Sequence, residues 1–298
     1  MPNWGEVLQE ITGAKIVSPV DAVRRKYLAK LNKYTGRNVI AYYSGWLQCG
    51  AYAGIDINDM DMNGFMTAVC GLDCSKGLDI LLHTPGGNIS AAEHIVHYLR
   101  SKFDTNIRAI IPQIAMSAGT MISCSCESIV MGKQSCLGPF DPQLNGISAR
   151  RVLIEFKQAA KEIAEDQNKI PIWQVIIGKY HPTFVQSCEL ACKRAEKLVS
   201  DWLYTNMFKD DPNACNKVRT IVQKFNEIGQ EFDHDKHIPM DDAISYGLKV
   251  KSLEDDQKLQ DLVLTVHHAF MHTFSQANIT KGIENHKGIG IFNFASRA

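Results

Sequence analysis

The sequence has no excess of charge of either sign, because 32 Lys and Arg residues balance 32 Asp and Glu residues. A chain without net positive charge has no general electrostatic attraction for nucleic acid or for an anionic membrane surface. No stretch approaches 18 consecutive apolar residues, so the sequence predicts no membrane span. The first residues also lack the basic and then apolar regions of a secretory signal peptide. These absences favour a soluble, cytoplasmic protein.

Paired cysteine motifs are absent too, although the chain has nine cysteines. An odd number of scattered cysteines is typical of free thiols in a reducing compartment. Cys124 and Cys126 lack the second half of a zinc motif, and the acidic stretch 56–63 lacks the glycine and final glutamate of a calcium loop. His268 and His272 lie one helical turn apart without an evident third ligand. We therefore predict neither a metal nor a cofactor.

The composition, with 45% apolar and 21% charged residues in 298, is ordinary for a globular protein with a sizeable core. Hydrophobic periodicity and turn residues predict an α/β fold. We expect strands at 38–46, 78–83, 107–111 and 128–131, helices at 20–34, 64–72, 91–103, 149–166, 184–208, 215–227 and 259–274, and a strand or tail at 288–294. These elements divide into an N-terminal helical extension (1–37), a core domain (38–250) and a C-terminal helical extension (251–298).

Two strand ends carry the residues best suited to chemistry. The strand at 78–83 runs into Thr-Pro-Gly-Gly, which ends at Gly87, and the strand at 107–111 leads to Ser117 in Met-Ser-Ala-Gly. Strand–helix–strand crossovers make the two strands parallel neighbours, so both turns should lie at one edge of the sheet. The N–H groups of Gly87 and Ala118 could then converge beside the Ser117 hydroxyl, as in an acyl-transfer site. The alternative is that Ser117 only caps a buried helix.

Four motifs resemble the ClpP/crotonase superfamily in order and spacing. They are Thr-Pro-Gly-Gly, Met-Ser-Ala-Gly, Leu-Gly-Pro-Phe-Asp-Pro-Gln at 137–143 and the Asp-Ala to Tyr-Gly-Leu stretch at 242–248. Within the superfamily the chain is most similar to the serine dehydrogenase proteinase family, which is related to signal peptide peptidase A. The resemblance covers residues 38–250 and implies a spiral of ββα units with peptidase activity, a peptide or protein substrate and a homo-oligomer. It also implies Ser117 as nucleophile and Gly87 and Ala118 as oxyanion-hole donors.

The resemblance defines the general base less well. ClpP-type peptidases carry a histidine in the turn that corresponds to 137–143, where this chain has Phe-Asp, ending at Asp141. Signal peptide peptidase A uses a lysine in a Gly-x-Tyr-Lys context, and the matching Gly-Lys-Tyr-His here places His181 at that position and Lys179 two residues earlier. Both side chains can act as a base. We favour a dyad of Ser117 with Lys179 over one with His181, and Asp141 either orients the base or is structural.

Two other functions compete with a serine endopeptidase. A non-catalytic ClpP-like scaffold or binding oligomer is favoured by the missing histidine. A crotonase-like enzyme would use the same two N–H groups to hold the enolate of an acyl-CoA thioester, but it does not need Ser117 beside them. His83, which precedes the Pro-Gly-Gly turn, is expected to be a core histidine with satisfied hydrogen bonds rather than a pocket residue.

Overall fold

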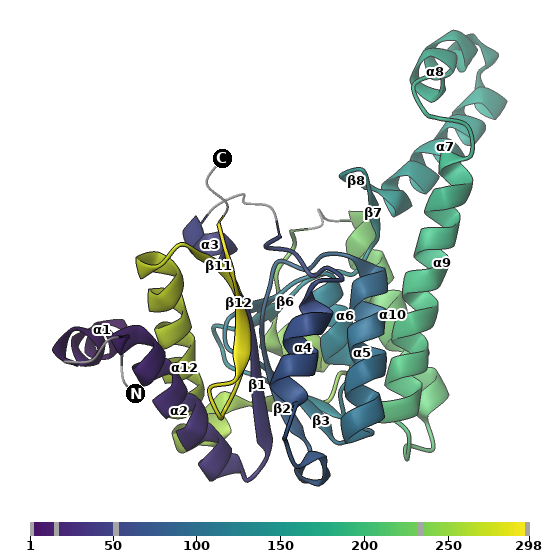
Figure 1. Ribbon diagram of the computed structural model, residues 1–298. Coiled ribbons are helices and arrows are strands. Elements are labelled where there is room, and N and C mark those ends of the chain that lie inside the picture. The colour runs from purple at the N-terminus through teal and green to yellow at the C-terminus, as the bar shows by residue number, and fades with distance from the viewer. Residues whose placement is uncertain (1–2, 15–17, 50–53, 232–234, 296–298) are drawn as a thin grey trace.

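A seven-stranded mixed sheet forms the middle layer of the computed structural model (Figure 1). The structure describes residues 3–14, 18–49, 54–231 and 235–295. The strand order is β10 (Val250–Ser252), β5 (Ser128–Met131), β3 (Ile107–Ile111), β2 (Leu78–His83), β1 (Asn38–Ser44), β11 (Ile279–Asn285) and β12 (Gly290–Phe294). The first five strands run parallel, and β11 and β12 extend the sheet as an antiparallel hairpin. The predicted α/β fold is confirmed.

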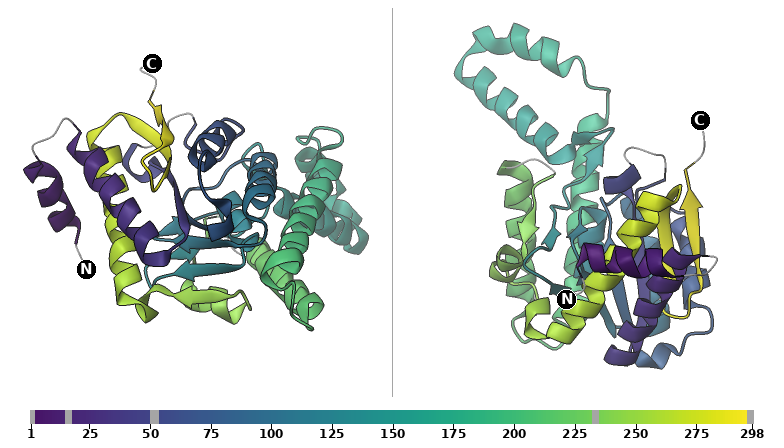
Figure 2. Two further views of the ribbon diagram at one scale, coloured as in Figure 1. Left: turned by 60° about the horizontal axis from the view of Figure 1, so that its bottom comes forward. Right: turned by 90° about the vertical axis from the view of Figure 1, so that its left-hand side faces the viewer.

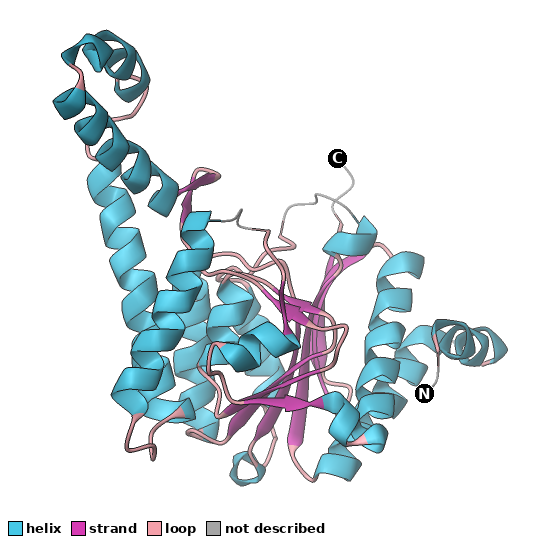
Figure 3. Ribbon diagram, turned by 180° about the vertical axis from the view of Figure 1, so that it is seen from behind, coloured by secondary structure: helices cyan, strands magenta, loops and turns pink. Residues whose placement is uncertain are grey.

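Helices cover both faces of the sheet, as Figure 3 shows from behind. In β1, Val39, Ala41 and Tyr43 face one helical layer, whereas Ile40 and Tyr42 face the other. Burial on both faces explains why the parallel strands have nearly continuous apolar sequences. The first layer contains α1 (Trp4–Gly13), α2 (Pro19–Thr35) and α12 (Gln257–Gln276), and the second contains α4 (Asp61–Val69), α5 (Ile89–Phe103), α6 (Ala118–Cys124), α9 (Phe184–Trp202), α10 (Ala214–Glu231) and α11 (Met240–Ser245).

A second, three-stranded sheet lies beyond the ends of the parallel strands. It consists of β4 (Ile114–Ala115), β6 (Cys136–Leu137) and β9 (Ile238–Pro239). The chain passes from β3 through β4 into α6, and from β5 into β6; Thr84, between β2 and α5, forms an isolated bridge with Ala115. A strand in the large sheet, a short pairing in the second sheet and a helix make up the ββα pattern that the resemblance implied.

A helical arm rises from the body beside the C-terminal ends of the parallel strands (Figure 2). We use this name for residues 143–190. The arm contains β7 (Gln143–Leu144), β8 (Ile147–Ser148), α7 (Ala149–Glu165), η2 (Gln167–Lys169), α8 (Ile170–Ile177) and the beginning of α9. The helix predicted at 184–208 ends at Trp202, and a π-helical turn, η3 (Leu203–Met207), continues it. The remaining short helices are α3 (Trp46–Cys49), η1 (Cys74–Lys76) and η4 (Leu253–Asp255).

The C-terminal segment joins the central sheet as well as forming a helix. The helix expected at 259–274 is α12, and β12 occupies most of 288–294. The sequence pattern does not predict β11, Ile-Thr-Lys-Gly-Ile-Glu-Asn, because its polar residues are all buried. Its Glu284 accepts hydrogen bonds from Arg24 and Arg25 of α2, at 2.7 Å each, and its Lys281 pairs with Asp61 of α4 at 2.7 Å. The division of the chain at residues 37 and 250 stays a prediction.

Within the described residues, no helix combines the length and the apolar character that crossing a membrane requires. All nine cysteines lie in described positions, and all are free thiols. His268 and His272 of α12 pack against Trp4 of α1; the His272 ring lies 4.1 Å from the Trp4 ring, centroid to centroid, and its Nε2 is 3.1 Å from the Trp4 carbonyl oxygen. This pair therefore serves helix packing.

Candidate active site

The Pro-Gly-Gly turn after β2 is held by a short extended segment around Ile57. The Ile57 N–H donates to the Gly86 carbonyl and the Asn88 N–H donates to the Ile57 carbonyl, both at 2.8 Å. Successive residues of an extended chain point to opposite sides, so the Gly87 N–H is directed away from Ile57. A Cβ on Gly87 would lie 2.4 Å from the Ile57 nitrogen, and the Gly87 φ is +148°. Only glycine permits this approach.

Ser117 stands at the start of α6 in a strained conformation. Its φ of 50° and ψ of −116° lie in a region that costs a residue with a side chain about 1–3 kcal/mol. Ser117 holds the N-cap position, yet its side chain forms no capping hydrogen bond. The residue is partly exposed. The hydroxyl is therefore presented to a neighbouring space rather than used to end the helix.

The two turns lie against each other, as the parallel strands predict. Thr84 donates from its N–H to the Ile114 carbonyl at 3.1 Å and accepts from the Met116 N–H at 3.0 Å. A Cβ on Gly86 would lie 2.7 Å from the Ser117 Cβ. These contacts place the glycine turn directly beside the serine.

Residues of both turns line one open hollow of about 500 Å³. Gly86, Gly87 and Ser117 line it. Ala118 follows Ser117 as the first residue of α6, so its N–H has no acceptor one turn earlier within the helix. The hollow is thus lined by Ser117 and Gly87, and the residue that follows the serine has a main-chain donor without a helical acceptor. Arg194, which the sequence pattern did not single out, stands on its wall and pairs with Glu93 at 2.5 Å.

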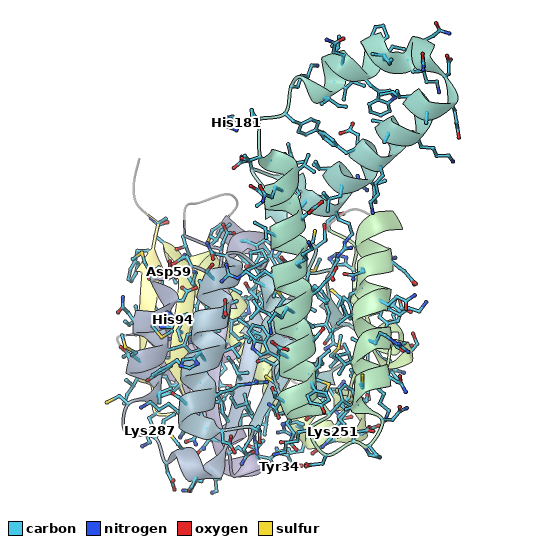
Figure 4. All side chains as sticks on the ribbon, turned by 90° about the vertical axis from the view of Figure 1, so that its right-hand side faces the viewer. Tyr34, Asp59, His94, His181, Lys251 and Lys287 are labelled. Carbon is cyan, nitrogen blue, oxygen red and sulfur yellow. The ribbon has the colours of Figure 1, made fainter. Side chains whose placement is uncertain are left out.

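The predicted bases lie elsewhere in the same chain. Lys179 and His181 are both exposed and line a separate hollow of about 420 Å³ on the arm, together with Asn145 and Ile147. Figure 4 shows His181 on the arm, above the body. The described residues that line the Ser117 hollow include no lysine and no histidine. The fold therefore brings Ser117, Gly87 and Ala118 together, but it does not bring Lys179 or His181 to them within one chain.

Asp141 is buried at the base of the arm. Its Oδ2 accepts a hydrogen bond from the Ser148 hydroxyl at 3.0 Å, and Ser148 is the N-cap residue of α7. The next three residues, 142–144, line the Ser117 hollow. Asp141 thus connects the wall of this hollow to the first helix of the arm.

His83 is buried, as expected, but its hydrogen bonds are not satisfied. Neither ring nitrogen has a protein partner within the described residues, and the same holds for the Nδ1 atom of His267 on α12. The two rings are 5.1 Å apart, centroid to centroid, and Tyr43 and Trp46 pack against His83. Burial lowers the pKa of His83 well below its usual value, and His267 adds to this effect. His83 is therefore a neutral core residue at neutral pH.

Comparison with known proteins identifies relatives of unknown activity. The chain is 28% identical over 190 residues to the uncharacterized protein MJ0137 of Methanocaldococcus jannaschii, an alignment that covers 64% of this chain and 59% of the relative. It is 33% identical over 90 residues to the uncharacterized protein MJ1495 of the same organism, with 30% of each protein covered. The chain thus spans less than two thirds of either relative.

A ClpP1 variant from Listeria monocytogenes is among the solved structures that match. The match covers 76% of this chain and 98% of that chain, with 13% sequence identity and a TM-score of 0.38.

The sequence profile of one family matches most of the chain. Its description is ClpP-like SDH-type serine proteinase, and it matches residues 18–273. The matched region contains both strand–turn–helix units and Ser117. The resemblance to the serine dehydrogenase proteinases is thereby confirmed, and the chain belongs to the family of ClpP-like SDH-type serine proteinases.

Proposed function

We propose that this protein is a serine endopeptidase that cleaves peptide bonds through an acyl-enzyme on Ser117. The observation that supports this most is the state of Ser117 itself. It begins a helix, but its hydroxyl does not cap that helix, and its strained backbone aims it into the hollow beside Gly86 and Gly87. An unfavourable backbone conformation persists only where the surrounding structure fixes it, and such conformations are common at functional sites.

The reaction follows from this arrangement. The Ser117 Oγ attacks the carbonyl carbon of the scissile bond while a base takes its proton. The N–H groups of Gly87 and Ala118 bind the oxygen on which negative charge develops. The C–N bond then breaks, the amine leaves with the proton from the base, and water hydrolyses the ester. The substrate is a peptide or protein.

The base predicted from the sequence, Lys179 or His181, would have to come from the arm of a second copy of the chain. In a single chain both residues line the separate hollow on the arm. Asp141 supports the arm through Ser148 in either case.

A fluorophosphonate probe tests the nucleophile directly. The probe forms a covalent bond with an activated serine and releases fluoride. We expect the wild type to be labelled and Ser117→Ala to show no labelling, with peptide hydrolysis reduced by roughly 10⁴- to 10⁶-fold, as is found when a catalytic serine is removed. Ser90→Ala, at the edge of the same hollow, is the matched control and should still be labelled.

One observation favours a non-catalytic scaffold as the second candidate. The described residues that line the Ser117 hollow include no lysine and no histidine. If the folded wild-type protein is not labelled under any condition that labels other serine peptidases, the peptidase proposal is wrong and the scaffold is favoured.

The protein forms a homo-oligomer in this proposal, and the outer end of the arm supports it. Ile172 and Val175 of α8 are 63% and 66% exposed, and large apolar side chains so exposed often mark contact surfaces. We expect the double variant Ile172→Asp, Val175→Asp to shift the mass measured by light scattering towards that of a single chain. Gln174→Asp on the same helix is the control. A wild type with the mass of one chain at micromolar concentration would contradict the oligomer.

A further inference from the structure

Two helices outside the sheet, α2 and α12, pack side by side in opposite directions (Figure 1). At one end of the pair, the Tyr34 hydroxyl of α2 donates to the carboxylate of Asp256, the N-cap residue of α12, at 2.9 Å. At the other end, Arg24 Nη1 donates to the Thr273 hydroxyl at 3.0 Å. Between these contacts the two helices leave an open hollow of about 550 Å³. None of the described residues that line it also lines the hollow of Ser117.

Much of the lining of this hollow is apolar. Tyr27 and Tyr34 of α2 stand two helical turns apart, roughly 10 Å along the helix axis, and Leu262 of α12 is buried beside them. A concave, largely apolar space of this volume is typical of small-molecule sites. The hollow can therefore enclose an apolar chain or ring of about this length.

Three lysines line the same hollow: Lys30 and Lys33 from α2 and Lys258 from α12. All three are exposed, and none is in an ion pair within the part of the chain that the structure describes. The other three basic residues of α2 are each in an ion pair, with Glu284 or with Glu10. The two lysines of α2 without a paired carboxylate are thus the two that line the hollow.

The charges of the lining do not balance. One carboxylate, Asp261, lines the hollow and accepts a hydrogen bond from the Gln257 side chain at 2.9 Å. Three ammonium groups against one carboxylate leave two positive charges in excess at neutral pH. The Lys30 ammonium lies 4.6 Å from the centroid of the Tyr27 ring, so positive charge is held directly beside an aromatic wall. A molecule that joins a negative group to an apolar body would match both parts of this lining.

We propose that the hollow between α2 and α12 binds an amphiphilic organic anion, a small molecule in which a carboxylate or phosphate is joined to an apolar chain or ring. The three lysines bind the anionic group, and the apolar part lies against the tyrosine rings and Leu262, where water is excluded from it. The aliphatic stems of the lysines extend the apolar wall. Figure 4 shows Tyr34 at the end of the body opposite the arm, so this site is separate from the proposed chemistry at Ser117.

Octanoate is a suitable probe, because it has one carboxylate and one apolar chain. Isothermal titration calorimetry of the full chain should show one octanoate bound per chain, and octanol and acetate, which lack the charge or the chain, should each bind at least roughly tenfold more weakly. The double variant Lys30→Met, Lys33→Met should also lower the affinity for octanoate roughly tenfold. Lys102→Met, Lys209→Met, at two exposed lysines outside the hollow, is the matched control.

A second variant should strengthen binding, which a folding defect cannot do. Asp261→Asn removes the carboxylate from the lining, so the affinity for octanoate should rise by roughly two- to fivefold. Ser117→Ala should bind octanoate as the wild type does, so failure of the peptidase proposal would leave this inference standing.

Three results would each overturn the inference. If octanol binds as tightly as octanoate, or if the Lys30, Lys33 variant binds octanoate as tightly as the wild type, the lysines do not select an anion. If octanoate does not bind but the protein sediments with vesicles of phosphatidylcholine and phosphatidylglycerol, the lysines contact a membrane surface instead. If neither octanoate nor the vesicles bind, the three lysines are solvated surface groups.

Discussion

Replacing Lys281 by methionine is expected to lower the free energy of unfolding by about 3–5 kcal/mol, because it leaves a buried carboxylate without its partner. The Lys281 ammonium and the Asp61 carboxylate are both 1% exposed, and their charged atoms are 2.7 Å apart. Asp61 also accepts hydrogen bonds from the Tyr42 hydroxyl at 2.8 Å and from the Asn58 N–H at 3.0 Å. Methionine has a similar length and shape, so the loss comes from the charge rather than from a cavity.

The same substitution should also slow acylation of Ser117. Lys281 donates a second hydrogen bond, at 2.5 Å, to the carbonyl of Asp56. The next residue, Ile57, holds the glycine turn through its hydrogen bonds with Gly86 and Asn88. We therefore expect Lys281 to act as a positioning residue. It holds the 56–58 segment, and this segment holds the turn that contains Gly87. In the proposed mechanism Gly87 supplies an oxyanion-hole donor, and displacement of such a donor costs roughly 10²- to 10³-fold in rate.

Two measurements test this expectation. Urea unfolding gives the stability, and the rate of fluorophosphonate labelling under conditions where the variant is fully folded gives the effect on the site. Lys287→Met is the matched control, because Lys287 is an exposed lysine beside the same hairpin. A Lys281→Met protein as stable as this control would show that the buried pair contributes no net stability. A normal labelling rate would show that the position of the 56–58 segment does not depend on the Lys281 hydrogen bond.

The elements that surround Ser117 could be predicted from local sequence. The strand at 78–83 coincides with β2, and the helix expected at 91–103 is α5 with two further residues at its start. Apolar β-branched runs followed by Pro-Gly-Gly or Ser-Ala-Gly specify strand, turn and helix through short-range geometry alone. Parallel pairing of the two strands then places both turns at one edge.

Long-range pairings could not be predicted in the same way. β11 is a polar sequence whose lysine and glutamate are buried only because Asp61, Arg24 and Arg25 neutralise them from other elements. Ile238 of β9 joins the small sheet only because it pairs with Leu137 of β6, about a hundred residues away. Neither pairing leaves a periodic signal in the sequence. For this reason local sequence patterns predict neither β9 nor β11.

Lowering the pH from 8 to 5 is expected to reduce the free energy of unfolding by about 2 kcal/mol through His267, and His83 adds a loss in the same direction. Burial lowers the pKa of His267 to about 3, with a smaller contribution from His268, and burial likewise lowers that of His83. Tyr43 packs against both rings, and neither ring pairs with a carboxylate in the described part of the chain. Protonation in the folded state is therefore opposed.

Stability is lost on the acid side because folding lowers the pKa of both histidines. Above pH 6.5 both histidines are neutral whether the chain is folded or not, so their full contribution to stability is present. Below pH 6.5 the unfolded chain binds protons that the folded chain does not, and each histidine costs about 1.4 kcal/mol of stability per pH unit until the folded pKa is reached. His83 directly precedes the Thr84-Pro85-Gly86-Gly87 turn, so acid should loosen this turn as well as the core.

Urea unfolding at pH 8 and at pH 5 checks this, with His267→Met as the test variant. Methionine adapts to irregular core space and does not titrate in this range, so the loss of stability between the two pH values should be about 2 kcal/mol smaller than in the wild type. His94→Met, at an exposed histidine, should lose as much stability as the wild type. If His267→Met loses as much as His94→Met, the buried histidine takes up its proton without unfolding, and His83 and His267 do not make the fold sensitive to acid.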